Sequence, residues 1–160
     1  MYFKPLALLT LSLSALSSTV AAVGSAKVHN ACDSSIFLWS VGSSVSGVHE
    51  IAPGETFSEQ YYRDPQTGGI ALKITTTAGG LYDGSPQLTF AYTLDPSQLW
   101  YDLSTIFGEG FAGEVLSVES GGECPGICWP DGTQPAGSQV KTCSTDVDQT
   151  LTVCADSCPA

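Results

Sequence analysis

Short runs of β-branched and aromatic residues, separated by turn-forming residues, recur along nearly the whole chain after residue 25. No amphipathic helical period persists for three turns in this part of the chain, so the pattern favours strands over helices. Turn-forming dipeptides lie between the runs, for example Pro53-Gly54, Asp83-Gly84 and Asp95-Pro96. The sequence therefore predicts an all-β domain, and regular short strands of this kind are typical of a β-sandwich or a flattened barrel.

The runs that we expect to form strands are residues 26–30, 35–41, 47–51, 56–62, 69–76, 87–94, 100–103, 114–119 and 150–154. Alternate side chains on a strand face the same side of a sheet. On that ground we expect one shared core that contains Ile36, Leu38, Ile70, Leu72, Ile74, Phe90 and Tyr92. Residues 121–144 are rich in Gly, Pro and Cys and almost lack periodicity, which predicts a disulfide-tied loop rather than a second domain.

The first residues have the pattern of a secretory signal. Lys4 precedes an apolar stretch over residues 5–16, and the small residues of Val20-Ala21-Ala22 follow. We expect cleavage after Ala22, with Ala26 as a second candidate site, so that residues 1–22 are the signal peptide and residues 23–160 are the mature domain. No other apolar run approaches the roughly 20 residues of a membrane-spanning helix. The sequence predicts an extracellular or cell-wall protein, with a monomer as the favoured state.

All six cysteines follow the expected signal, at Cys32, Cys124, Cys128, Cys143, Cys154 and Cys158. An even number of cysteines in a secreted chain indicates three disulfides, although many pairings remain open on sequence alone. Zinc is the alternative, because two pairs of cysteines are each four residues apart, but tight zinc pairs usually have two-residue spacers. Disulfides are the preferred interpretation, and we expect no metal and no cofactor.

Charge and histidine content exclude several other classes of function. The chain has 16 Asp and Glu against 5 Lys and Arg, so nucleic acid and anionic membranes are poor partners. Nucleophilic catalysis needs a base, yet His29 and His49 both lie on expected strands, and no Gly-x-Ser-x-Gly elbow occurs. Aspartates cluster at Asp146, Asp148 and Asp156, which makes calcium a further alternative, but the EF-hand pattern is absent.

Three blocks of sequence carry a resemblance to a known family. They are residues 28–32 with 36–39, residues 51–57 with 68–74, and residues 88–94 with the Tyr101-Asp102-Leu103-Ser104 segment. They resemble three parts of thaumatin-like proteins. The first block resembles the opening strand and first cysteine of that family, and the second resembles its Gly-Glu turn and the strand after it. The third block resembles the core strand and its Tyr-Asp-x-Ser segment. Within that fold the chain most resembles the fungal yeast-phase-specific, or antigenic thaumatin-like, proteins. The resemblance implies a disulfide-stapled thaumatin-like β-sandwich and a secreted or surface location.

The same resemblance implies a pairing of the cysteines. The first cysteine of the fold pairs with one near the C-terminus, which matches Cys32 with Cys154. The first of the two paired cysteines, Cys124, then matches Cys143, and Cys128 is left for Cys158.

The chain departs from full-length thaumatin-like proteins in two ways that bear on function. Only 14 residues separate Cys128 from Cys143, where those proteins carry a long cysteine-rich insertion, so the second domain and one wall of the cleft should be missing. The resemblance links the family's acidic cleft to β-glucan binding and weak glucanase activity. Ala91 stands where the family has a core-strand glutamate, and only Asp102 carries over cleanly.

Two hypotheses on function follow, a wall-carbohydrate binder that acts as a surface antigen and a weak or degenerate β-1,3-glucanase of the antifungal defence type. Hydrolysis needs two carboxyl groups about 5 to 9.5 Å apart, and Asp102 has only Asp83, Asp95 and Glu59 as candidate partners. In a cleft without its wall we expect Asp102 to keep a near-normal pKa. Binding needs aromatic rings beside hydrogen-bonding groups, and the candidate ligand-binding residues are Asp102, Trp100, Tyr101, Tyr92 and Asp83. The alternative for these aromatic residues is packing in the core.

Overall fold

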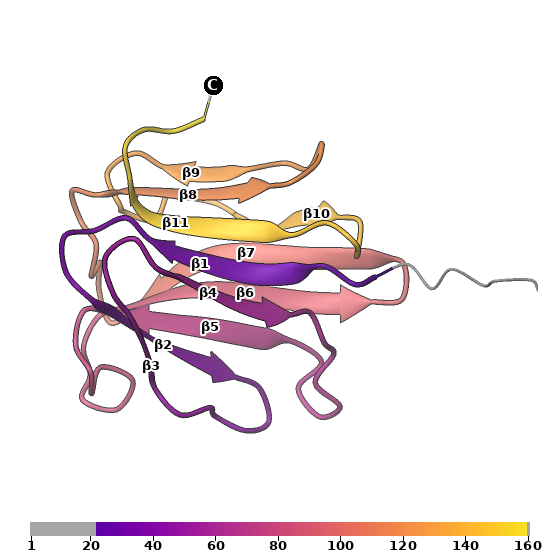
Figure 1. Ribbon diagram of the computed structural model, residues 1–160, viewed down its shortest axis with the longest axis horizontal. Coiled ribbons are helices and arrows are strands. Elements are labelled where there is room, and N and C mark those ends of the chain that lie inside the picture. The colour runs from indigo at the N-terminus through magenta and orange to yellow at the C-terminus, as the bar shows by residue number, and fades with distance from the viewer. Residues whose placement is uncertain (1–21, 160) are drawn as a thin grey trace, which may run out of the picture.

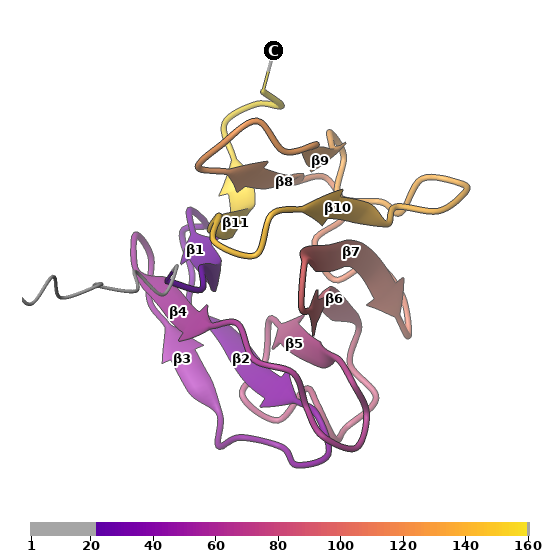
Figure 2. The same cartoon turned by 90° about the vertical axis from the view of Figure 1, so that its right-hand side faces the viewer.

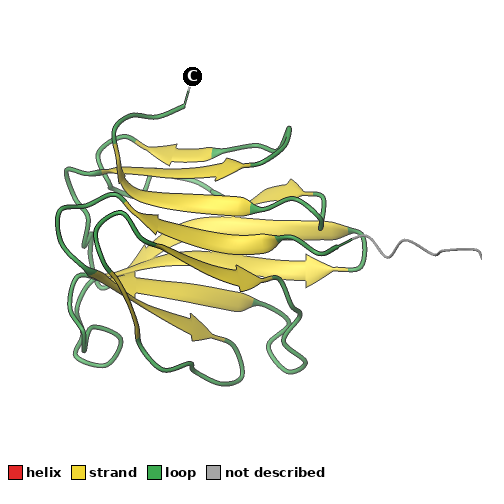
Figure 3. Cartoon of the chain, viewed as in Figure 1, coloured by secondary structure: helices red, strands yellow, loops and turns green. Residues whose placement is uncertain are grey.

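The computed structural model describes residues 22–159, and in that range the protein consists of strands and loops without a helix (Figures 1 and 3). The expected signal peptide lies outside the described residues except for Ala22. The strands form two sheets that enclose one core, and Figure 2 shows how the sheets curve around it. This architecture confirms the all-β sandwich or flattened barrel that the sequence predicts.

One sheet contains β1 (Ser25–Asn30), β4 (Thr56–Gln60), β8 (Val115–Ser120), β9 (Ile127–Trp129) and β11 (Gln149–Ala155). The spatial order of its strands is β4-β1-β11-β8-β9. The first and last strands along the chain, β1 and β11, run parallel at its centre, whereas the other neighbouring strands are antiparallel. The first and last strands of the domain therefore lie side by side.

The other sheet contains β2 (Ile36–Val41), β3 (His49–Ile51), β5 (Ile70–Thr75), β6 (Gln87–Asp95), β7 (Gln98–Ile106) and β10 (Lys141–Cys143). It is antiparallel, with the order β10-β7-β6-β5-β2-β3. Its two longest strands, β6 and β7, form a hairpin in which Asp95 is paired with Gln98. The turn between them begins at Pro96, as the Asp95-Pro96 dipeptide predicts.

The core confirms the alternation read from the sequence. The side chains expected to face inward are all at most 2% exposed, and they are Ile36, Leu38, Ile70, Leu72, Ile74, Phe90 and Tyr92. The two sheets also contact each other at one edge, where the rings of His49 on β3 and Phe57 on β4 lie 4.9 Å apart. This contact brings the edge strand of one sheet to the edge strand of the other, which gives the sandwich its barrel-like form.

Three disulfides link elements that are distant in sequence. They join Cys32 to Cys154, Cys124 to Cys143 and Cys128 to Cys158, which are the pairs that the family resemblance implies. The first connects the end of β1 to the end of β11. The second connects the segment before β9 in one sheet to β10 in the other. The third anchors the C-terminal residues to β9, so every bond holds together parts of the sandwich that meet only in the folded state.

The expectation of a loop over residues 121–144 was wrong in part. The segment is tied by two of the disulfides, but it also contains β9 and β10, which add an edge strand to each sheet. Both strands have three residues, which is too short for an alternation to show in the sequence. They form because β8 and β7 offer unpaired edges next to them.

Candidate functional site

The outward face of the six-stranded sheet carries the two most distinctive residues of the site. On β7 the side chains of Leu99, Tyr101 and Leu103 are buried in the core, so the alternating residues point away from it. Trp100 is one of these outward residues and is 43% exposed, and Asp102 is half-buried beside it. Strand geometry therefore places an indole ring and a carboxylate on the same face, two residues apart.

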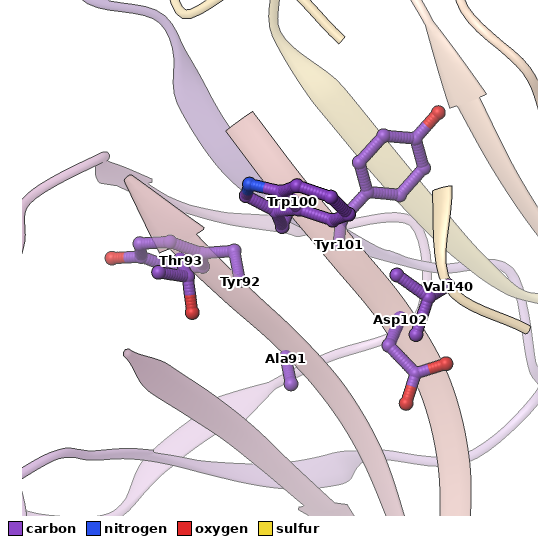
Figure 4. Close-up of a pocket in the computed structure, with 7 residues that line it drawn as sticks. All are labelled: Ala91, Tyr92, Thr93, Trp100, Tyr101, Asp102 and Val140. Atoms are coloured by element: carbon purple, nitrogen blue, oxygen red, sulfur yellow. The ribbon is translucent and has the colours of Figure 1, made fainter. Parts of the chain in front are cut away.

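The neighbouring strands form the floor and rim of a shallow pocket of about 150 Å³ around these two side chains. In the strand register Ala91 of β6 lies opposite Asp102, and Thr93 lies opposite Trp100. Val140, just before β10, closes the other side and is itself 46% exposed. Figure 4 shows this group, with Trp100 and Asp102 along β7 and the small side chain of Ala91 between the strands. The pocket is predominantly apolar, and the Asp102 carboxylate is its only acidic group.

The loop between β5 and β6 covers one end of this outward face. The Gln87 side-chain amide donates to the carbonyl oxygens of Gly80 and Leu81 at 3.3 and 3.2 Å. A Cβ atom on Gly80 would lie 2.4 Å from Oγ1 of Thr75, so the backbone of the loop rests directly on β5. Thr75 and Gln87 are buried as a result. The loop leaves the Trp100 and Asp102 end of the face open to solvent.

The electrostatics of Asp102 differ from the sequence-based expectation. Burial raises the pKa of its carboxyl group, and only a backbone hydrogen bond from Leu103 opposes this effect. Among the described residues its side chain has no hydrogen-bonding or ion-pairing side-chain partner. The expectation of a near-normal pKa was therefore wrong, because Trp100, Ala91 and Val140 desolvate the carboxylate even without the missing cleft wall.

Lys73 is the cationic residue of the same sheet face, but it does not neutralise Asp102. It lies on β5, separated from β7 by β6, and its Nζ donates to Oγ1 of Thr89 at 3.0 Å. Burial lowers the pKa of its ammonium group. The Lys73 ammonium forms no ion pair within the described residues, so the sheet face carries two separate, half-buried charges.

Two of the aromatic residues predicted to bind the ligand lie in the core. Tyr92 and Tyr101 also line the pocket, but they are only 2% and 1% exposed. The Tyr92 hydroxyl donates to Oε1 of Glu59 at 2.7 Å across the sandwich, and the Tyr101 hydroxyl donates to the carbonyl of Pro125. Burial raises the pKa of both tyrosines. Their rings join the two sheets and are not free to stack on a ligand.

Asp83, the remaining residue predicted to bind the ligand, does not line the pocket. It is exposed on the loop between β5 and β6, where it accepts hydrogen bonds from the backbone N–H and the hydroxyl of Ser85 at 2.9 and 2.6 Å. These bonds lower its pKa. Asp95 is likewise engaged, in an ion pair with Arg63 at 2.5 Å, and Glu59 accepts from Tyr92. The three candidate partners of Asp102 thus each have a structural partner of their own.

The sequence did not reveal Val140 and Thr93 as parts of the site. Thr93 was placed on a strand but was not assigned to the outward face beside Trp100. Val140 belongs to the segment interpreted as a loop, although the β-branched residues Val140 and Thr142 shortly before Cys143 were a weak signal of a short strand. Only the pairing of β10 with β7 brings it to Asp102.

The alternatives that involved metals can be compared with the structure. Zinc coordination by cysteine is wrong, because all six cysteines form disulfides. Asp148 pairs with Lys27 at 2.6 Å, and Asp146 accepts from the Ser144 hydroxyl. Over residues 22–159 no group of three or more His, Cys, Asp and Glu side chains gathers as a metal site would require. His29 lies on β1 and contacts Oγ1 of Thr56 at 2.9 Å, as an ordinary strand histidine does.

Known structures resemble this fold. The protein elicitor MoHrip2 from Magnaporthe oryzae superposes with a TM-score of 0.69 at 23% identity, over 82% of this chain and 99% of that one. The thaumatin-like xylanase inhibitor TLXI gives a TM-score of 0.57 at 12% identity, over 81% of this chain and 99% of the inhibitor. At these identities the likeness concerns the fold, which is thaumatin-like.

Sequence comparison gives the family. An antigenic thaumatin-like protein of Arthroderma benhamiae is 33% identical over 162 residues, which span 91% of this chain and 81% of the relative. The secreted thaumatin-like protein calA of Emericella nidulans is 27% identical over 142 residues, 81% of each chain. Residues 13–155 match the model of the Blastomyces yeast-phase-specific protein family. Because that match spans most of the sequence, the chain belongs to this family of fungal thaumatin-like proteins.

Proposed function

We propose that this protein is a secreted or wall-associated, non-catalytic protein that binds a cell-wall carbohydrate, with β-glucan as the first candidate, and acts as a surface antigen. The observation that carries the proposal is the exposed Trp100 beside Asp102 on an open sheet face. An indole ring offers an apolar surface for a sugar ring, and a carboxylate accepts hydroxyl hydrogen bonds. The Ala91 floor leaves room for a flat ligand between them.

An extracellular location supports this role. All six cysteines are oxidised in pairs, as is usual in secreted proteins and rare in the cytosol. One relative carries the name of a secreted protein and another that of an antigen. None of the described residues forms a helix able to cross a membrane. We infer that residues 1–22 direct the chain into the secretory route and that residues 23–160 are the mature domain.

A weak hydrolase is the second candidate, because the raised pKa of Asp102 is a property that a general acid needs. The mechanism also requires a second carboxyl group on the facing side of the sugar. The position opposite Asp102 in the register is Ala91, which cannot supply it. Asp83, Asp95 and Glu59 are held by other partners, and for this reason binding is the better-supported function.

A pull-down on insoluble β-1,3-glucan, run beside a reducing-sugar assay on the same preparation, tests the proposal. We expect retention on the glucan without sustained release of reducing ends. Trp100→Ala should lower the retained fraction about tenfold, which corresponds to about 1.4 kcal/mol, because the indole supplies the apolar surface on which the sugar ring rests. Tyr82→Ala is the control, because Tyr82 is also exposed but lies on the β5–β6 loop outside the pocket. It should change retention less than about twofold.

Two results would contradict the proposal. Equal retention of wild type and Trp100→Ala would remove Trp100 from the binding surface. Release of reducing ends that disappears in a folded Asp102→Asn variant would establish the hydrolase instead. Substitution of Tyr101 is unsuitable for this experiment, because its buried ring contributes to the core and its loss would act through folding.

A further inference from the structure

The half-buried carboxylate of Asp102 lacks the side-chain partners that several other aspartates of the fold have. Asp64 accepts from the backbone and hydroxyl of Ser43, Asp148 pairs with Lys27, and Asp95 pairs with Arg63. The Asp102 carboxylate is instead surrounded mainly by apolar groups and accepts one backbone hydrogen bond, from Leu103. Desolvating a charge without a partner costs free energy, so the fold tolerates at this position an unfavourable charge that a ligand can compensate.

Trp100, the neighbouring residue on this face, restricts the chemical class of that ligand. Trp100 lies two residues away on the same face of β7, with its indole exposed at the rim of the pocket. The face of an indole attracts a cation, and a carboxylate at the same site gives that cation an opposite charge to contact. A partly desolvated carboxylate next to an aromatic ring is therefore an arrangement suited to an organic ammonium group.

The charge of the whole chain acts in the same direction. The net charge of −11 attracts cationic ligands and disfavours anionic ones. Lys73, the cation of the same sheet face, lies two strands from Asp102, a separation of about 10 Å across the sheet. Its ammonium is directed to Thr89, so the space next to the Asp102 carboxylate stays available to a cation from outside.

We propose that the carbohydrate bound at Trp100 and Asp102 is an amino sugar polymer in its deacetylated, cationic form, with a glucosamine ammonium on Asp102 and the sugar ring on Trp100. This inference rests on the proposed carbohydrate binding and specifies its ligand class. A neutral glucan offers Asp102 only hydroxyl hydrogen bonds and binds more weakly. An N-acetylated sugar lacks the ammonium and gives Asp102 no opposite charge.

Calorimetric titration with three soluble oligomers of equal length tests this. The probes are hexamers of glucosamine, of N-acetylglucosamine and of β-1,3-linked glucose. The titration is run at about pH 6, where an ordinary carboxyl group is ionised and most of the weakly basic amino groups of the glucosamine hexamer carry a proton. We expect the glucosamine hexamer to bind about tenfold more tightly than either neutral hexamer. Asp102→Asn should abolish that preference and leave the affinity for the glucose hexamer within about twofold.

A matched control separates the local contact from the general attraction of an acidic protein for a polycation. Glu50 lies exposed on β3, at the far edge of the same sheet, and forms no side-chain hydrogen bond among residues 22–159. Glu50→Gln removes the same charge and should lower glucosamine binding less than about twofold. A second variant, Ala91→Lys, places an ammonium opposite Asp102 and should also abolish the preference for glucosamine.

The outcomes distinguish the two proposals. Equal affinity of wild type for all three hexamers, or equal effects of Asp102→Asn and Glu50→Gln, would overturn the amino sugar while leaving carbohydrate binding intact. Binding of none of the hexamers and no retention on insoluble glucan would overturn the proposed function, and the amino sugar with it. Thermal unfolding of each variant checks that the sandwich is retained.

Discussion

At the scale of single residues, Trp100, Tyr101 and Asp102 show how one strand serves both stability and binding. The buried Tyr101 ring contributes to the core, whereas its two neighbours face solvent and form the candidate site. Asp102 combines partial burial with a raised pKa, so its ionised form is disfavoured by the fold. Such an unfavourable charge on an open face is typical of positions retained for function at some cost in stability.

The prediction at this scale concerns stability and pH. A raised pKa means that the folded state favours the protonated carboxyl, so ionised Asp102 destabilises the fold above its pKa. This cost disappears as the pH falls below the unfolded-state value of about 3.9. Asp102→Asn should therefore increase the free energy of unfolding at pH 7, by less than about 1 kcal/mol because the group is partly exposed to solvent.

Urea unfolding of wild type, Asp102→Asn and Glu50→Gln at about pH 7 and about pH 3 measures the effect. The gain from Asp102→Asn should be present at the higher pH and absent at the lower one, and Glu50→Gln should show no such change. A destabilised Asp102→Asn variant at pH 7 would mean that the carboxylate has a structural partner.

At the scale of elements, β1 shows which part of the chain the fold requires at its start. Ala26 is fully buried in the core, and Gly24 is buried as well. The Gly24 backbone N–H donates to the carbonyl of Thr145, and its carbonyl accepts from the N–H of Tyr61, both at 2.9 Å. The Ser25 N–H donates to Oδ1 of Asp148 at 2.7 Å. Residues 23–26 thus connect β1 to β4 and to the segment before β11.

This arrangement predicts which of the two candidate cleavage sites is used. Cleavage after Ala22 keeps all of these contacts, whereas cleavage after Ala26 removes them together with the first residues of β1. We expect the mature secreted protein to begin at Val23. Intact mass measurement and N-terminal sequencing of protein from culture medium or a wall extract give the answer. A stable protein that begins at Lys27 would contradict the expectation.

At the scale of the whole molecule, acidic side chains support the connections between strands. Asp64 is the clearest case, since it accepts hydrogen bonds from Ser43, Gln66 and Thr67 and joins the loop after β2 to the segment before β5. These bonds hold its pKa well below the ordinary value. The pKa values of Asp83, Asp131, Asp146 and Asp148 are also lowered by hydrogen bonds.

An aspartate whose pKa is lower in the folded state than in the unfolded state stabilises the fold at pH values above its unfolded-state pKa. This stabilisation is lost as the pH falls from the unfolded-state pKa through the folded-state pKa. The thermal midpoint should accordingly change little between about pH 7 and 5 and fall below about pH 4. Asp64→Asn should lower the midpoint at pH 7 and reduce its dependence on acid. Circular dichroism melts across this range test the prediction, and a midpoint at about pH 2.5 that equals the one at pH 7 would contradict it.

Much of this architecture can be predicted from the sequence by itself. The alternation of apolar residues is a local property of each strand, so the core residues from Ile36 to Tyr92 and most strand positions could be identified without long-range information. The family resemblance implied the thaumatin-like fold and the same cysteine pairs that the structure contains. These features depend on short-range periodicity or on a known relative.

The candidate site was decided by the tertiary structure. Trp100 and Tyr101 are neighbouring aromatic residues, and Tyr101 is the buried one because the five-stranded sheet packs on the face of β7 that also carries Leu99 and Leu103. Val140 and Asp102 are far apart in sequence and meet because β10 pairs with the edge of β7. The burial that raises the pKa of Asp102 arises from residues on β6, on β7 and before β10 together. Each of these properties depends on contacts between distant segments, which no local pattern in the chain specifies.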